Sequence, residues 1–173
     1  MPGGYDVSAG LANAITRCVN ADTTRSSVTA AAQPDLTVPL AQGAYVFKYY
    51  LALQSAATTT GHKASVNFTG TKGVFAAALR WVTAASAASD DVPDQDHVAA
   101  AGGVVSAFTA RTPGTAGWGV LTDVDAINAD ILYIVEGIIT VTVAGNLELY
   151  WAPEAAAAAT LKAGSALLAW KVG

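Results

Sequence analysis

The chain has 173 residues, which suits one domain with an ordinary hydrophobic core, and its single cysteine, Cys18, excludes an intrachain disulfide. Nine basic and thirteen acidic residues give a net charge of −4, and the basic residues are scattered singly, which argues against a nucleic-acid-binding groove. Only 13% of the residues are charged, against about 25% in a typical soluble domain, which indicates either a surface covered by partner subunits or the compositional bias of a GC-rich genome.

Neither a membrane-spanning segment nor a secretion signal is predicted. No apolar run reaches the length of about 18 residues that a transmembrane helix needs. The start of the chain lacks a basic stretch followed by an apolar core, so we expect no signal peptide and synthesis in the cytoplasm.

Residues 1–33 differ from the rest of the chain and are predicted to form an N-terminal arm and linker. Apolar residues are sparse there but recur at four-residue intervals, which favours a short helix or an extended strap: Val7, Leu11, Ile15 and Val19. Cys18, in the same segment, is expected to be a small buried apolar residue. Residues 34–173 are assigned to a single β-domain.

Two-residue periodicity begins at Leu36 and predicts extended strands over most of the chain. In residues 45–54 the odd-numbered side chains are expected to face one way and the even-numbered ones the other. Further strands are predicted over residues 36–40, 65–69, 74–83 and 104–111, with a long loop over 84–103 and a turn around Trp118 over 112–119.

The strongest predicted strand covers residues 131–143, where Gly137 indicates a bulge or a close approach. Ala144-Gly145-Asn146 is a tight-hairpin signal, so residues 147–151 are expected to pair with that strand. Residues 155–159 are predicted as a helical turn or a loop, and 165–172 as the last strand. About eight strands with Gly-rich turns and no βαβ alternation predict an all-β fold, an antiparallel sandwich of jelly-roll type.

No residue pattern predicts catalysis, and we expect a non-enzymatic protein without a cofactor or metal. His62 and His97 fall in predicted loops and lack neighbours at zinc-ligand spacing. Glu136 and Glu148 could face each other across the predicted hairpin like the carboxylates of a glycosidase, but the chain is small for such an enzyme. The aromatic residues are expected in the core rather than on a carbohydrate-binding platform. An acidic loop could chelate calcium, but a solvated loop is favoured; its carboxylates are Asp90, Asp91, Asp94 and Asp96.

Several segments resemble, in the same order, a β-domain common in tailed-phage virion proteins. The opening of that domain is similar to residues 33–40 (QPDLTVPL) and 43–47 (GAYVF). Its later strands and ending are similar to residues 136–139 (EGII), 145–153 (GNLELYWAP) and 160–168 (TLKAGSALL). The chain departs from the family at Pro153-Glu154, where a Gln usually stands, and in its longer acidic loop.

The resemblance implies a jelly-roll module that assembles, often as a homotrimer, on a phage head or tail. With one β-domain and a short arm, the chain is expected to be a capsid decoration or cement protein of the virion that binds the major capsid protein or other virion subunits. Neither nucleic acid nor a membrane is an expected partner. Tyr5, Leu11 and Ile15 are the expected arm contacts. The alternative is a tail-fibre or minor tail protein that binds a receptor or carbohydrate, with Trp118 as its candidate residue.

Overall fold

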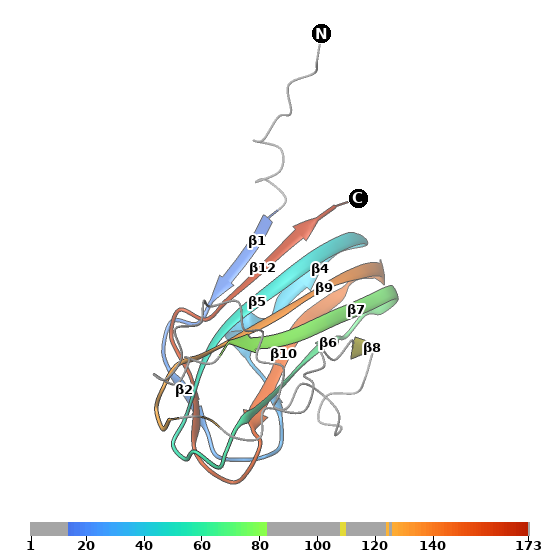
Figure 1. The fold of residues 1–173 in the computed structure, drawn as a ribbon. Helices are drawn as coiled ribbons and strands as arrows, with labels where there is room; N and C mark the ends of the chain where they lie inside the picture. Colours follow the sequence, from blue (N-terminus) through green and yellow to red (C-terminus); the bar gives the residue numbers. More distant parts are fainter. Residues whose placement is uncertain (1–13, 83–107, 110–123, 125, 173) are drawn as a thin grey trace, which may run out of the picture.

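The computed structural model describes residues 14–82, 108–109, 124 and 126–172, which form two antiparallel sheets packed face to face (Figure 1). The large sheet runs in the order β1 (Ala14–Cys18), β12 (Ala166–Lys171), β5 (Gly43–Ser55), β9 (Ile131–Val143), β7 (Thr71–Val82) and β8 (Phe108–Thr109). In the same sheet, β11 (Ala159–Leu161) pairs with β5 on one side and with β2 (Thr23–Arg25) on the other. In the small sheet, β10 (Gly145–Pro153) lies between β6 (His62–Phe68) on one side and β3 (Ala31–Ala32) and β4 (Val38–Leu40) on the other. A 3-10 turn, η1 (Pro34–Leu36), precedes β4. The predicted all-β sandwich is confirmed.

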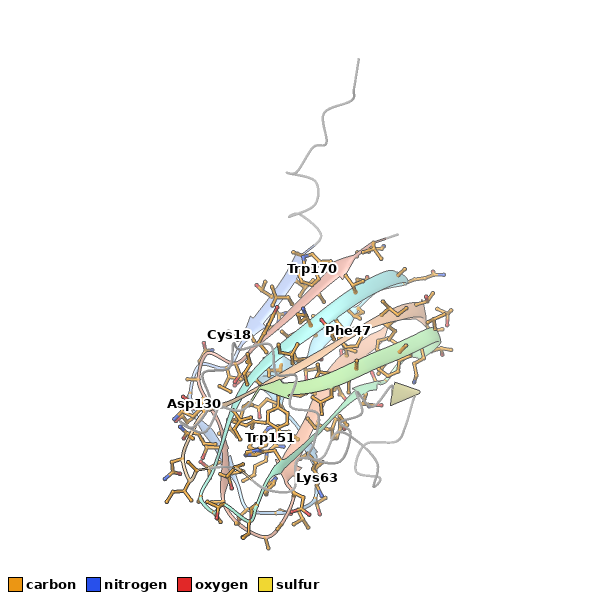
Figure 2. The ribbon with its side chains drawn as sticks, in the orientation of Figure 1. Cys18, Phe47, Lys63, Asp130, Trp151 and Trp170 are labelled. Atoms are coloured by element: carbon orange, nitrogen blue, oxygen red, sulfur yellow. The ribbon has the colours of Figure 1, made fainter. Side chains whose placement is uncertain are left out.

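The two long strands bury alternate residues, as their periodicity predicts. On β5 every odd-numbered residue from Tyr45 to Ser55 is buried, and on β9 the odd-numbered apolar residues are buried except for Val143 at the strand end. These side chains meet those of the small sheet in one core, in which Phe47 and Trp151, labelled in Figure 2, come from opposite sheets. The expected close approach at Gly137 is confirmed, because a Cβ there would lie 2.6 Å from Phe47 Cζ.

The predicted hairpin at Ala144-Gly145-Asn146 is wrong, because β9 and β10 belong to different sheets. β9 pairs with β5 and β7, whereas β10 pairs with β3, β4 and β6. A Cβ on Gly145 would lie 2.2 Å from the Gly70 nitrogen, and one on Gly70 would lie 2.3 Å from the Val143 carbonyl oxygen. Gly70 lies in the connection from β6 to β7, so the chain passes twice between the sheets at one corner. The two glycines permit this crossing.

The described part of the predicted arm is extended and belongs to both sheets. β1 pairs with β12, β2 with β11 and β3 with β10, so the helical alternative is wrong over Ala14–Cys18. Ile15 is half-buried against the core and Val19 lies within it. Cys18 is exposed rather than buried, since the even-numbered residues of this edge strand share the outer side of the sheet with their partners on β12.

The Arg25 guanidinium links the extended N-terminal segment, residues 14–33, to the small sheet. It donates hydrogen bonds to the carbonyl oxygens of Ala31 (2.6 Å), Trp151 (2.7 Å) and Ala32 (2.8 Å), and lies 4.5 Å from the centroid of the Trp151 ring. The Trp151 indole N–H in turn donates to Gln33 Oε1 at 3.1 Å. Burial lowers the pKa of Arg25 from its ordinary value.

His62 begins β6 and is fully buried, so its predicted place in a loop is wrong. Its Nδ1 lies 3.2 Å from the Tyr133 hydroxyl, and its Nε2 lies 3.0 Å from the Gln54 carbonyl oxygen. Desolvation lowers the pKa of His62, which favours the neutral imidazole. The side chain therefore joins the small sheet to β9 and β5 of the large sheet, a structural role.

Candidate functional site

The outer face of the large sheet carries apolar side chains where solvent would favour polar ones. Since the odd-numbered residues of β5 point into the core, the even-numbered residues point outward, and the same holds for β9 and β12. From this outward parity we define the outer patch as Val46, Lys48, Tyr50, Leu132, Ile134, Glu136, Ile138, Leu168 and Trp170. The same parity also carries small or polar residues toward the strand ends: Ala44, Ala52, Gln54, Thr140, Thr142 and Ala166.

Cross-strand pairing arranges the outer patch in rows. Trp170 lies opposite Val46, which lies opposite Ile138 on β9. One row further along, Lys48 lies opposite Glu136, and the row after that joins Tyr50 to Ile134. Trp170 lies toward the β1 side of the sheet, as Figure 2 shows. The rows thus form an apolar band around one central charge pair.

Ile138, Leu132 and Tyr50 leave 48%, 38% and 37% of their surface exposed. Exposed apolar side chains that gather into one large patch often mark an interaction surface. A shallow open groove of about 400 Å³ runs over the same face, lined by Val46, Phe47, Lys48, Tyr50, Glu136, Gly137, Ile138 and Trp170.

One ion pair supplies the charge of the outer patch. Lys48 Nζ lies 2.7 Å from Glu136 Oε2, and it also lies 5.5 Å from the centroid of the Tyr50 ring. The hydrogen bond to Glu136 raises the pKa of Lys48. Both side chains are partly exposed, so the pair contributes at most about 1 kcal/mol to folding. Its main physical effect is to place one positive and one negative charge side by side on an apolar face.

The outer face of the small sheet is different in chemistry. Lys63 and Asn67 of β6 and Glu148 and Tyr150 of β10 point away from the core. Asn67 Nδ2 donates to Glu148 Oε2 at 3.1 Å. Partial burial, followed by the neighbouring Glu148, raises the pKa of Tyr150. This face carries more polar side chains than the outer patch, although Ser65 and Ala152 on the same parity are buried.

The structure describes few of the residues singled out from the sequence. Tyr5, Leu11, Trp118, His97 and the acidic loop, including residues 90–96, lie outside the described ranges. Ile15 is half-buried on β1 and packs against the chain's own core.

Glu136 and Glu148 do not face each other, because β9 and β10 lie in different sheets. Glu136 pairs with Lys48 and Glu148 accepts from Asn67, so the glycosidase-like arrangement is wrong. Over the described ranges, no group of three or more His, Cys, Asp or Glu side chains could hold a metal ion. The same part of the chain contains no helix long and apolar enough to cross a membrane.

Sequence reasoning missed the outer patch, although its signal was present. Val46 and Tyr50 on β5, and Ile134 and Ile138 on β9, are apolar residues on the parity opposite to the core-facing one. Strands that are apolar on both parities are typical of sheets covered on both faces.

Compared with protein-family models and with curated proteins, the chain matches none.

Proposed function

We propose that this protein is a structural subunit of a tailed-phage virion, a capsid decoration or cement protein that packs in several copies on the assembled shell. The observation that carries the proposal is the outer patch: a largely apolar sheet face, partly exposed over the described residues, on a sandwich whose sequence is only 13% charged. Such a face is costly in water and favourable when covered, by about 25 cal/mol for each Å² of apolar surface buried. This chemistry supports an adhesive structural role.

The strand order supports a jelly-roll class of sandwich. β1 pairs with β12, β4 with β10 and β5 with β9, so strands from the two ends of the chain pair successively inward. A long antiparallel hairpin that is rolled up produces this order. β7 departs from the order, since it pairs with β9 in the large sheet rather than with β6.

The proposed partners are other copies of the chain, as the homotrimer that the family resemblance implies, and the major capsid protein. A subunit that binds the assembled shell, and not its unassembled subunits, stabilises the shell by mass action. Tyr5 and Leu11 remain the proposed arm contacts, whereas Ile15 packs against the chain's own core and is no longer proposed as one. The proposed location is the virion, after synthesis in the host bacterial cytoplasm.

Cryo-electron microscopy of the virion tests this proposal. We expect density for the β-sandwich at regular positions on the outside of the head, and co-sedimentation of purified protein with assembled shells but not with unassembled capsid subunits. Density confined to the tail, or equal binding to unassembled subunits, would contradict it.

A tail protein that binds carbohydrate is the second candidate, and the groove of the outer patch is what favours it. Tyr50 and Trp170 both line this groove, and aromatic rings can stack on sugar faces. Trp118, the candidate from the sequence, lies outside the described ranges. Titration of the protein with host-surface glycans, followed by the NMR signal of the Trp170 indole, should shift that signal if this role is correct and leave it unchanged if it is not.

A further inference from the structure

We propose that His62 is an acid-sensitive contact between the two sheets: protonation of its buried ring opens one end of the sandwich while the rest stays folded. The inference goes beyond the proposed function and does not depend on it. The part that opens is the connection between β5 and β6, residues 56–61. Two observations carry the inference: hydrogen bonds that fix the ring in its neutral form, and backbone contacts by which this connection holds other segments.

The hydrogen-bond partners of His62 determine which ring nitrogen carries the hydrogen. Nε2 lies 3.0 Å from the Gln54 carbonyl oxygen, which can only accept, so Nε2 is the protonated nitrogen. Nδ1 is then bare and accepts a hydrogen bond from the Tyr133 hydroxyl, 3.2 Å away. Burial raises the pKa of Tyr133 well above its ordinary value, so this hydroxyl keeps its hydrogen. A proton added at Nδ1 would meet that hydrogen and displace the donor.

A positive charge on His62 would be poorly stabilised, because the ring is fully buried and a carbonyl and a hydroxyl occupy its two nitrogens. The charged groups on the described elements around the ring are Asp130 before β9, Glu154 after β10 and Lys63 beside it on β6. Asp130 is exposed and accepts from Gln54 Nε2, and Lys63 has the opposite parity to His62. Burial is the main influence on the pKa of His62 and lowers it, while the Gln54 carbonyl oxygen raises it.

The connection that leads into His62 holds segments distant in sequence. Three backbone hydrogen bonds of residues 56–61 reach other parts of the chain, one before β9 and two between β10 and β11. The pairs are Val124 N–H to the Thr58 carbonyl oxygen (2.9 Å), Glu154 N–H to the Gly61 carbonyl oxygen (3.0 Å) and Ala56 N–H to the Ala158 carbonyl oxygen (2.9 Å). Displacement of His62 would therefore loosen residues 56–61 and 154–158 together.

Protonation takes one proton from water to Nδ1 and leaves a cation that water stabilises better than the core does. The charged ring therefore favours an open state in which it is solvated. Opening can stay local, because Lys63–Phe68 keep their pairing with β10 when the first residue of β6 leaves. The other end of β6, where Gly70 and Gly145 approach, contains no histidine and should not respond to acid.

Hydrogen exchange of the full chain, followed by mass spectrometry from about pH 8 to about pH 5, tests the proposal over the range in which histidine titrates. Rates are corrected for the intrinsic effect of pH on exchange. Protection of residues 56–61 and 154–158 should fall by up to about tenfold for each pH unit below 6.5, since one proton is taken up on opening. Residues 43–51 and 145–150 should keep their protection.

Two histidine variants provide the matched comparison. His62→Gln keeps a neutral donor for the Gln54 carbonyl oxygen and should remove the pH dependence of protection. His97→Gln, which replaces the other histidine of the chain, should retain it. Nitrogen-15 NMR of the unmodified protein adds a readout that does not depend on either variant folding: at neutral pH, His62 should show the hydrogen on Nε2 and a bare Nδ1.

Three results would overturn the inference. The first is protection of residues 56–61 that does not change with pH in the unmodified protein. The second is a pH dependence that persists in a folded His62→Gln variant, or a loss of protection spread evenly over all strands. The third is an NMR signature with the hydrogen on Nδ1 at neutral pH, which would contradict the hydrogen-bond directions.

Discussion

Replacement of Arg25 by alanine should destabilise the protein by about 2–4 kcal/mol. The guanidinium donates to three backbone carbonyl oxygens at 2.6–2.8 Å, those of Ala31, Ala32 and Trp151, and stacks on the Trp151 ring. Hydrogen bonds from a charged donor contribute about 1.5–3 kcal/mol each. The cost of partly burying the cation offsets some of that sum, and water can reach some of the carbonyl oxygens once the side chain is gone.

Urea denaturation of the full chain, followed by far-ultraviolet circular dichroism, measures the free energy of unfolding. Arg25→Lys should recover only part of the loss, since a lysine cannot span three acceptors with a planar fork. Arg17→Ala is the matched control: Arg17 is exposed on β1 and donates to the Thr16 carbonyl oxygen alone, so its loss should change stability by less than about 0.5 kcal/mol. An Arg25→Ala variant as stable as Arg17→Ala would refute the view that the Arg25 side chain holds the N-terminal segment against β10.

Three further effects should be measurable by the same unfolding experiment. Burial lowers the pKa of His62 below its ordinary 6.5. The free energy of unfolding that depends on the neutral imidazole is therefore complete above pH 6.5 and declines as the pH falls below that value. A His62→Gln variant whose stability falls with pH as steeply as that of the unmodified protein would disprove this. Gly137→Ala should cost about 2–3 kcal/mol, because the new Cβ would lie 2.3 Å from the Ala76 carbonyl oxygen, whereas Gly73→Ala, whose Cβ would meet nothing closer than 3.8 Å, should stay near wild type. A double-mutant cycle on Lys48 and Glu136 should give a coupling free energy of unfolding below about 1 kcal/mol for the monomer, because both side chains are partly exposed. A larger coupling would contradict the solvent exposure of this ion pair.

Sequence patterns predicted the strands in which alternate residues are buried, and failed where contacts between distant residues determine which sheet a strand joins. β5 and β9 follow the two-residue period almost without exception, because one face of each strand fills the core. The crossing at Gly145 looks locally like a hairpin, but β10 pairs with β3, β4 and β6, which are distant in sequence, and the close approach to Gly70 permits the crossing.

His62 precedes the strand predicted over residues 65–69, yet it continues an alternation with Ala64, Val66 and Phe68 that buries all four side chains. Its two buried hydrogen-bond partners, the Tyr133 hydroxyl and the Gln54 carbonyl oxygen, lie on strands of the other sheet. A period-two reading that included residue 62 would have found the strand, but not the partners that make burial of the ring tolerable.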